Sequence, residues 1–372
     1  YEIVFGDWNS DVCSSDLLRI GILGGNHEIT KLIGDALGSP GTQSDLMFYN
    51  RLDNGLSCIF TAVAPISYPD KVKSLLQACA ISQIHIMVID AETGINAETG
   101  EIMVAMDLYG RYFGAKGIAV IGNITNATEW RVEEIQKQLP KLLAPTFLKD
   151  IELIPLKERA DYDHLKKQIL EIGKTSARIS LESPPYAKVL IDHVFPVKGV
   201  GTVVLGLVSQ GQITAGEMYD LIPVQKKIIL RSIQKQDRDF KTAEVGDRVG
   251  LALKGVRHED VDRNAVFCSL GAFQTSKEFK AKVKISPYYK PGGQNNKVSP
   301  NEPKNYHLIA DLAISVAKLT GGDEISPGGE GVLNITLEKE LAHDAQGLKG
   351  IIAEFGAFEK RLRIAGYFEQ IL

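Results

Sequence analysis

The sequence is most informative at first through what it lacks. It has no run of about 18 consecutive apolar residues, so no membrane-spanning helix and no membrane partner are expected. Its four cysteines and seven histidines show no spacing typical of a metal site or a redox motif. These observations predict reduced thiols in a cytoplasmic protein without a bound metal.

The sequence also lacks an excess of positive charge. Its 42 Lys and Arg residues face 46 Asp and Glu residues, which gives a net charge of -4. A protein that coats nucleic acid through bulk charge is therefore excluded, and no DNA partner is expected. Only local basic patches remain for contacts with RNA.

The patterning divides the chain into three expected domains. Residues 18–180 alternate short apolar runs with helical periods, which predicts an α/β domain with a mostly parallel sheet. Residues 184–272 and 276–372 consist of short β-rich runs with glycine punctuation, which predicts two small β-barrels. Residues 288–305 are expected to form a long exposed loop. The Ser/Asp-rich residues 1–17 are expected to be a tail, either non-native, like the read-through of a sequencing adapter, or natively disordered.

Within the α/β domain, the turn signal Asp53-Asn54-Gly55 precedes an apolar run that begins at Leu56. This run is therefore expected to have an antiparallel partner strand before it.

A family resemblance is carried by residues 194–266. They contain, in order, Val-Phe-Pro-Val-Lys-Gly-Val-Gly-Thr-Val-Val-Leu-Gly, Gly-Gln-Ile-Thr-Ala-Gly-Glu, Arg-Ser-Ile-Gln, Val-Gly-Asp-Arg-Val-Gly-Leu-Ala-Leu-Lys-Gly-Val and Glu-Asp-Val-Asp-Arg-Asn-Ala-Val. This order closely resembles the second domain of elongation factor Tu, and still more that of the SelB branch of translational GTPases. The resemblance implies a Ras-like GTPase domain followed by two β-barrels. Residues 41–45 with Tyr49 and Asn50 then look like the first switch region, and residues 358–366 look like closing strands of the third domain.

The phosphate loop of that family is degenerate here. A working loop reads Gly-x-x-x-x-Gly-Lys-[Ser/Thr] after the first strand, so that N–H groups and a lysine face the phosphates and a hydroxyl holds Mg²⁺. The first strand of this chain is followed by Gly24, Gly25, Asn26, His27, Glu28, Ile29, Thr30 and Lys31. The second glycine is missing, Thr30 and Lys31 stand in reversed order, and Glu28 brings a negative charge.

The other nucleotide motifs are degenerate too. Residues 61–70 lack the Asp-x-Pro-Gly-His of the second switch, and Asn123 and Asn126 stand where Asn-Lys-x-Asp would read the guanine base. Residues 154–157, Ile-Pro-Leu-Lys, replace the last motif. Together these changes predict a pseudo-GTPase without catalytic residues or a cofactor. The alternative is a genuine elongation factor that binds GTP and Mg²⁺ through an unusual loop. Gly24 and Gly25 at a helix start could still offer N–H donors to an anion.

The resemblance also implies candidate RNA-binding residues. The family's second domain helps hold the aminoacylated 3′ end of tRNA, and the positions that match this pocket include Ser232, beside Arg231, and Arg248. Ser232 departs from the acidic residue of elongation factor Tu. The alternative for Arg248 is a structural ion pair with Asp247 or Asp220.

Three basic sets are candidates for contacts with RNA phosphates, or else are solvated lysines and arginines that protect strand edges. They are Lys226, Lys227, Arg231, Lys235, Arg238 and Lys241; Lys280, Lys282 and Lys284; and Lys360, Arg361 and Arg363. The sequence therefore predicts a translation-factor-like protein that binds tRNA, the ribosome or a translation partner. A scaffold that binds only protein is the second alternative.

Overall fold

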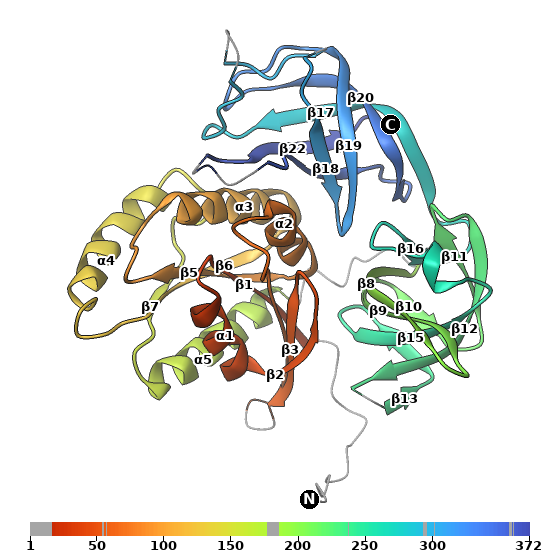
Figure 1. Ribbon diagram of the computed structural model, residues 1–372, viewed down its shortest axis with the longest axis horizontal. Coiled ribbons are helices and arrows are strands. Elements are labelled where there is room, and N and C mark those ends of the chain that lie inside the picture. The colour runs from red at the N-terminus through yellow and green to blue at the C-terminus, as the bar shows by residue number, and fades with distance from the viewer. Residues whose placement is uncertain are drawn as a thin grey trace, which may run out of the picture.

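The computed structural model describes residues 17–53, 56, 58–176, 186–236, 238–292, 296–300, 302–356, 359 and 361–372. The expected tail lies outside these residues except for Leu17, and so do Asn54, Gly55 and Lys360. The chain forms three units, an α/β unit and two β-barrels (Figure 1). Among the described residues, no helix combines the length and apolar composition needed to cross a bilayer.

The first unit is a seven-stranded sheet in the order β2-β3-β4-β1-β5-β6-β7. Strands β1 and β4 to β7 run parallel, and the β2–β3 hairpin joins β4 antiparallel. The antiparallel partner expected before the run at Leu56 is therefore confirmed as β3. The elements are β1 (Leu17–Leu23), α1 (His27–Leu37), β2 (Ser39–Gln43), β3 (Met47–Asp53), β4 (Cys58–Ala64), α2 (Val72–Ile81), β5 (Ile84–Asp90), α3 (Ala97–Phe113), β6 (Lys116–Gly122), α4 (Trp130–Leu143), β7 (Leu153–Pro155) and α5 (Arg159–Ser176).

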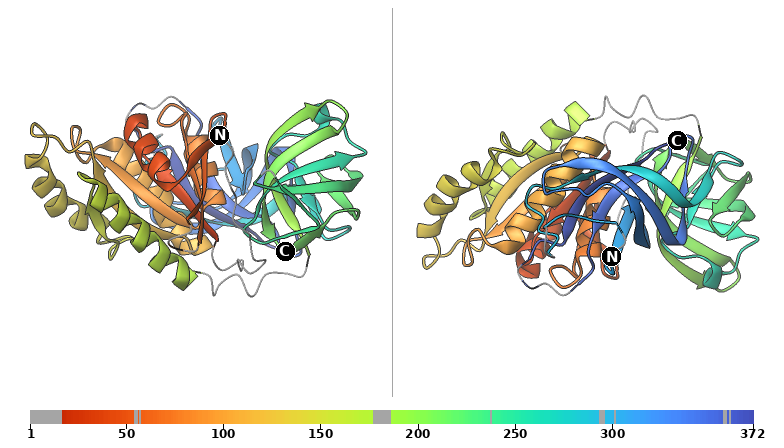
Figure 2. Two further views of the ribbon diagram at one scale, coloured as in Figure 1. Left: turned by 90° about the horizontal axis from the view of Figure 1, so that it is seen from below. Right: turned by 90° about the horizontal axis from the view of Figure 1, so that it is seen from above.

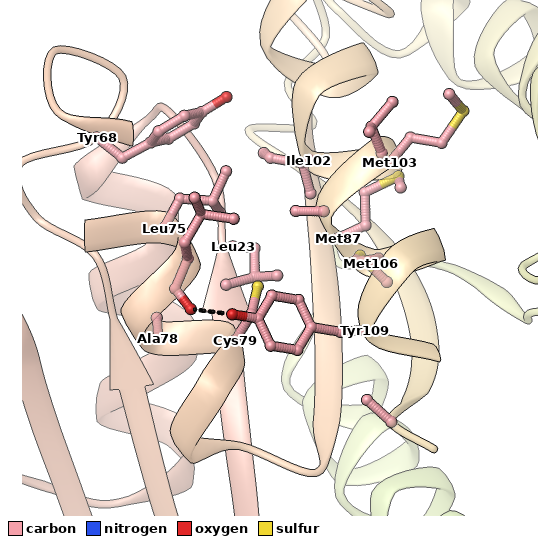
Figure 3. Packing of buried hydrophobic residues seen from close by; sticks show 14 of the residues in the cluster. Leu23, Tyr68, Leu75, Ala78, Cys79, Met87, Ile102, Met103, Met106 and Tyr109 are labelled. Carbon is pink, nitrogen blue, oxygen red and sulfur yellow. Dashed lines mark hydrogen bonds between the residues drawn. The ribbon is translucent and has the colours of Figure 1, made fainter. Parts of the chain in front are cut away.

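Both faces of this sheet are buried, which explains why its central strands read as continuous apolar runs. Helices α1 and α5 pack on one face, whereas α2, α3 and α4 pack on the other. Figure 3 shows the second face, where side chains of α2 and α3 meet those of β1 and β5. The hydroxyl of Tyr109 donates a hydrogen bond of 3.0 Å to the Leu76 carbonyl oxygen, which joins the two helices (Figure 3).

The second unit closes into a barrel because β11 pairs with both β16 and β12. Its tight turns use glycines with positive φ, such as Gly216 at 93° and Gly246 at 97°, where a Cβ would cause strain. The elements are β8 (Lys188–Val197), β9 (Gly201–Gln210), β10 (Gln212–Thr214), β11 (Met218–Ile222), β12 (Lys226–Lys235), β13 (Arg238–Phe240), β14 (Thr242–Glu244), β15 (Arg248–Lys254), η3 (His258–Asp260) and β16 (Val266–Cys268).

The third unit is a closed barrel in the order β17-β20-β19-β18-β21-β22. The expected fold class, a mostly parallel α/β domain followed by two β-barrels, is confirmed. The elements are β17 (Gln274–Ile285), β18 (Tyr306–Ala310), β19 (Ala313–Gly322), β20 (Glu330–His343), β21 (Lys349–Ala353) and β22 (Ile364–Gln370).

The segment of residues 288–305 is only partly the exposed loop that was expected. Tyr289 and Val298 are each 1% exposed and belong to the core of the third unit. Val298 also pairs with Ile325 through two backbone hydrogen bonds, of 2.8 and 2.9 Å. The prediction is wrong at these positions because apolar side chains within the polar segment fold back onto the barrel.

A buried ion pair connects the third unit to the first. Arg363, just before β22, donates hydrogen bonds to both carboxylate oxygens of Glu101 on α3, at 3.1 and 2.6 Å. Each residue is 1% exposed. The third unit consequently lies over α2 and α3, while the second lies beside the β2–β3 hairpin (Figures 1 and 2).

Arg363 therefore does not belong to the basic set that was expected to contact RNA phosphates. Its guanidinium is buried and also donates to the carbonyl oxygens of Pro69 (2.7 Å) and Asp70 (3.1 Å). Arg361 pairs with Glu354 at 3.0 Å, and Lys360 lies outside the described residues. The predicted third basic set is wrong at Arg363, because its partners come from a distant part of the chain.

We predict that Glu101→Gln lowers the free energy of unfolding by about 3 kcal/mol, because it leaves the buried Arg363 charge uncompensated. Urea denaturation followed by circular dichroism measures this loss. The matched control is Glu133→Gln, which removes an exposed pair with Lys137 and should cost less than about 0.5 kcal/mol. Equal losses for the two variants would contradict the role assigned to the buried pair.

Candidate functional site

The connection between β1 and α1 is too short to be a phosphate loop. β1 ends at Leu23 and α1 begins at His27, so Gly24, Gly25 and Asn26 form the whole connection. A phosphate loop instead places six residues, Gly-x-x-x-x-Gly, before its lysine, and their N–H groups surround the phosphates. Here the extra helical turn of α1 takes the place of the second half of such a loop.

The first N–H groups of α1 are occupied by the protein itself. The side-chain oxygen of Asn26 accepts hydrogen bonds from the N–H groups of Glu28 (3.0 Å) and Ile29 (3.3 Å). The carbonyl oxygen of Asn26 accepts a third bond, from the N–H of Thr30, at 3.1 Å. The N–H groups of Glu28 and Ile29 are among the donors that a helix start offers to an anion, whereas the bond from Thr30 is the first regular bond of the helix. Asn26 therefore fills the position of a ligand oxygen.

Asn26 is also tied to the ends of the two neighbouring strands. Its side-chain nitrogen donates to one carboxylate oxygen of Asp90, the last residue of β5, at 2.7 Å. The other carboxylate oxygen accepts from the side-chain nitrogen of Asn123, directly after β6, at 2.9 Å. Ligands of open α/β sheets bind outside these carboxyl ends of the strands. An amide–carboxylate–amide chain, which we call the Asn–Asp–Asn bridge, crosses this position.

A cavity of about 470 Å³ remains beside the bridge. Its described lining contains the carboxylates of Glu28, Asp90 and Glu98 and no lysine or arginine. The Glu98 carboxylate lies so close to Gly25 that a Cβ there would be 1.8 Å from one of its oxygens. Burial raises the pKa of Glu98, and the nearby charges of Glu101 and Asp90 raise it further. The cavity is thus electrostatically unfavourable for a triphosphate.

The two residues with phosphate-binding side chains do not serve this cavity. Thr30 is buried, and its hydroxyl donates to the carbonyl oxygen of His27 at 3.1 Å. Lys31 is exposed on α1 and does not line the cavity, whereas His27 lines it from an exposed position at the helix start. The structure therefore separates the ammonium and hydroxyl groups that a magnesium–phosphate site would need together.

The position that would read the guanine base is altered as well. Asn123 points to the carboxylates of Asp90 and Glu92, and Asn126 is exposed. A shallow cavity of about 350 Å³ beside Ile124 is crossed by an ion pair of 2.8 Å between Lys157 and Glu129. Among the described residues, no group of three or more His, Cys, Asp or Glu side chains is arranged to hold a metal ion.

The segment that corresponds to the second switch is fixed in place. Tyr68 is fully buried, and its hydroxyl donates to the carbonyl oxygen of Glu98 at 3.2 Å. The carbonyl oxygens of Pro69 and Asp70 accept from Arg363 of the third unit. A loop held on both sides by buried groups is poorly suited to change its conformation with a bound nucleotide.

In the second unit, Arg248 forms an ion pair, but with neither of the expected partners. Its guanidinium makes two bonds to the Asp192 carboxylate, of 2.5 and 2.9 Å. Asp247 instead pairs with Lys235 at 3.0 Å, and Asp220 accepts from the N–H of Gly271 at 2.7 Å. Asp192 was not predicted because it lies two residues before the segment that carries the resemblance.

The structure does not bring the three candidate acceptor-end residues together. Ser232 lies opposite Ala252 on β15. Arg248 is the first residue of that strand, four residues before Ala252 and therefore about 13 Å from it along the strand. Arg231 is exposed and donates to the carbonyl oxygen of Val200 at 2.9 Å.

The sequence analysis missed Asp192, which pairs with Arg248, and also His193 and Arg263, which both contact Asp192. Burial opposes ionisation of Asp192, but Arg248 and His193 outweigh it and lower the pKa of Asp192. The Nδ1 of His193 donates to the Asp192 carboxylate at 2.5 Å, while its buried Nε2 has no hydrogen-bond partner among the described residues.

Some of the predicted basic residues are neutralised and others face solvent. Lys226 pairs with Asp260 at 2.7 Å, Lys235 with Asp247 at 3.0 Å and Lys282 with Glu330 at 3.6 Å. As expected for a strand, Lys280, Lys282 and Lys284 lie on one exposed face of β17. Lys227 and Lys241 of the first set are exposed as well.

Comparisons with known proteins place the chain beside translation factors. No protein-family model matches it. It is 29% identical over 312 residues to an uncharacterised protein of Methanocaldococcus jannaschii, which covers 84% of this chain and 88% of that protein. It is 30% identical over 234 residues to the selenocysteine-specific elongation factor of the same organism, covering 62% of this chain and 49%, about half, of that factor.

Among solved structures, the chain resembles translation elongation factor SelB from Methanococcus maripaludis in complex with the GTP analogue GppNHp. The TM-score is 0.79 at 24% identity, and the match covers 96% of this chain and 79% of that one.

We predict that Asn26→Ala lowers the free energy of unfolding by about 1–2 kcal/mol, because it removes the N-cap of α1 and one donor to Asp90. Asn26→Asp separates the two effects. It keeps the capping oxygen but puts a second carboxylate beside Asp90, so it should also destabilise. Urea denaturation measures both variants against Asn126→Ala, an exposed control with little expected effect. An Asn26→Asp variant with an unchanged free energy of unfolding would contradict the bridge to Asp90.

Proposed function

Because this chain is a SelB-like relative of the translational GTPases, we propose that it acts in translation without binding or hydrolysing a guanine nucleotide. The observation that carries the proposal is the Asn–Asp–Asn bridge of Asn26, Asp90 and Asn123. It crosses the carboxyl ends of three neighbouring strands, where the nucleotide of such a domain would lie.

A bound triphosphate would have to overcome two unfavourable terms. It would displace the Asn26 side chain from the N–H groups of Glu28 and Ile29, which costs the helix its cap. It would also bring its charge to a cavity whose described lining has three carboxylates and no lysine. Hydrolysis would further need a group that places water, and the segment that corresponds to the second switch lacks the histidine for that role.

RNA is the ligand that we propose, as tRNA or as part of the ribosome. On the third unit, the exposed face of β17 carries Lys280 and Lys284 beside Lys282, which pairs with Glu330. On the second unit, the guanidinium groups of Arg248 and Arg263 are paired with Asp192 and Asp45 and would have to exchange these partners for phosphates. Both surfaces belong to the barrels, so their use does not depend on the occupied site beside β1.

We predict that a titration of the purified protein with GTP and Mg²⁺, followed by isothermal calorimetry, gives no saturable binding. The reason is the filled helix start and the acidic cavity. An established GTP-binding elongation factor serves as the positive control. A submicromolar dissociation constant would contradict the proposal and favour the genuine GTPase.

We predict that the protein binds tRNA in filter-binding assays and that the affinity falls as the salt concentration rises. Lys284→Gln on β17 should reduce the slope of log affinity against log salt by about 1. Lys137→Gln, on the exposed face of α4, should leave it unchanged. Absence of any salt-dependent binding would overturn the proposal of an RNA ligand and favour a scaffold that binds protein.

A further inference from the structure

The turn of the β2–β3 hairpin is held by the second unit. Arg263, between η3 and β16, donates to a carboxylate oxygen of Asp45 at 2.5 Å and to the hydroxyl of Ser44 at 2.7 Å. The same guanidinium donates to the carbonyl oxygen of Asp192 at 2.8 Å and to the side-chain oxygen of Gln77 at 3.3 Å. Arg263 therefore links the hairpin to both the barrel and α2.

A second arginine of the barrel holds the hairpin from the side. Arg248 donates to the hydroxyl of Thr42 on β2 at 3.2 Å, and its guanidinium lies 3.7 Å from the ring centroid of Phe48 on β3. Apart from Thr42, the residues of β2 are exposed. Thr42, Ser44 and Asp45 thus attach the outer part of the hairpin to these arginines, in addition to the pairing of β2 with β3 and a contact of 3.8 Å between Asp45 and Lys73 on α2.

The groups that the hairpin presents are those of an anionic ligand. A carboxylate on one arginine and a hydroxyl on the other resemble the oxygens with which a phosphate or an acyl group binds guanidinium. Burial opposes ionisation of Asp45, but the charge of Arg263 outweighs it and lowers the pKa of Asp45. Asp45 is therefore a carboxylate when it contacts Arg263.

A carboxylate that belongs to the same chain competes effectively with free anions for an arginine. Because the hairpin belongs to the same chain, its Asp45 carboxylate faces Arg263 at an effective concentration in the range of about 1 mM or more. The side chains of Arg248 and Arg263 are only 14% and 21% exposed in this arrangement. A free anion therefore meets Arg263 occupied by Asp45 of the hairpin, and Arg248 occupied by Asp192 of its own barrel and by Thr42 of the hairpin.

We propose that the β2–β3 hairpin is an autoinhibitory clasp, which withholds Arg248 and Arg263 from outside anions until it moves away from the second barrel. The inference rests on the proposed function for the identity of the anion, a phosphate group at the acceptor end of an RNA. The clasp itself rests only on contacts within the chain.

The clasp is tested by the reactivity of its arginines toward phenylglyoxal, which modifies accessible guanidinium groups. Peptide mass spectrometry compares Arg263 and Arg248 with Arg257, whose side chain is 75% exposed and serves as the internal reference. Asp45→Asn should raise the reactivity of Arg263 several-fold. Thr42→Val, which keeps the side-chain shape but removes the hydroxyl, should raise that of Arg248. Asp35→Asn, on an exposed position of α1, is the matched control.

Unchanged reactivity of both arginines in the Asp45 and Thr42 variants, in folded protein, would overturn the clasp. Hydrogen exchange of residues 39–53 gives an independent readout, which should accelerate in Asp45→Asn and not in Asp35→Asn.

Filter binding of unfractionated tRNA then tests the link to the proposed function. Release of the clasp should increase the affinity of Asp45→Asn about tenfold over that of the unaltered protein. If arginine reactivity rises but no variant binds tRNA, the result supports the clasp and contradicts the proposed RNA ligand.

Discussion

The three-residue connection between β1 and α1 is the constraint on which the properties of the first unit depend. It starts the helix at His27 and puts Asn26 at the N-cap, where one side chain satisfies the first N–H groups and reaches Asp90. Asp90 in turn orients Asn123. A polar bridge across three strand ends therefore stabilises the fold at the position where the fold would otherwise bind a ligand. Under the proposed function, this one bridge accounts both for the absence of nucleotide binding and for the local stability of the sheet.

Arginine side chains link the first unit to both barrels. Arg363 holds the loop after β4 through two carbonyl oxygens while it pairs with Glu101, and Arg263 joins the β2–β3 hairpin to the second barrel. These two segments correspond to the switch regions of the family, which follow the γ-phosphate in a working GTPase. In this structure their partners are arginine side chains of the two barrels, so these contacts do not require a nucleotide.

The sequence allowed the fold to be predicted where the information is local. Continuous apolar runs predicted the parallel strands, and the missing lysine and glycine predicted the loss of the phosphate loop. Contacts between distant residues could not be predicted in this way. Arg363 and Glu101 are 262 residues apart, and Arg248 and Asp192 are 56 apart. For this reason Arg363 was taken for a surface residue and Arg248 was given the wrong partners. The capping of α1 by Asn26 was missed because the pattern of the family places the helix start later.

The central claim is that the chain's own side chains occupy the nucleotide position. The most direct measurement is the nucleotide content of the full-length protein, purified without added nucleotide, denatured in acid and resolved by ion-pair chromatography. The account predicts that no GDP or GTP is released. Guanine nucleotide released in near-equal amount to protein would contradict it, since Asn26 and the nucleotide cannot use the same N–H groups.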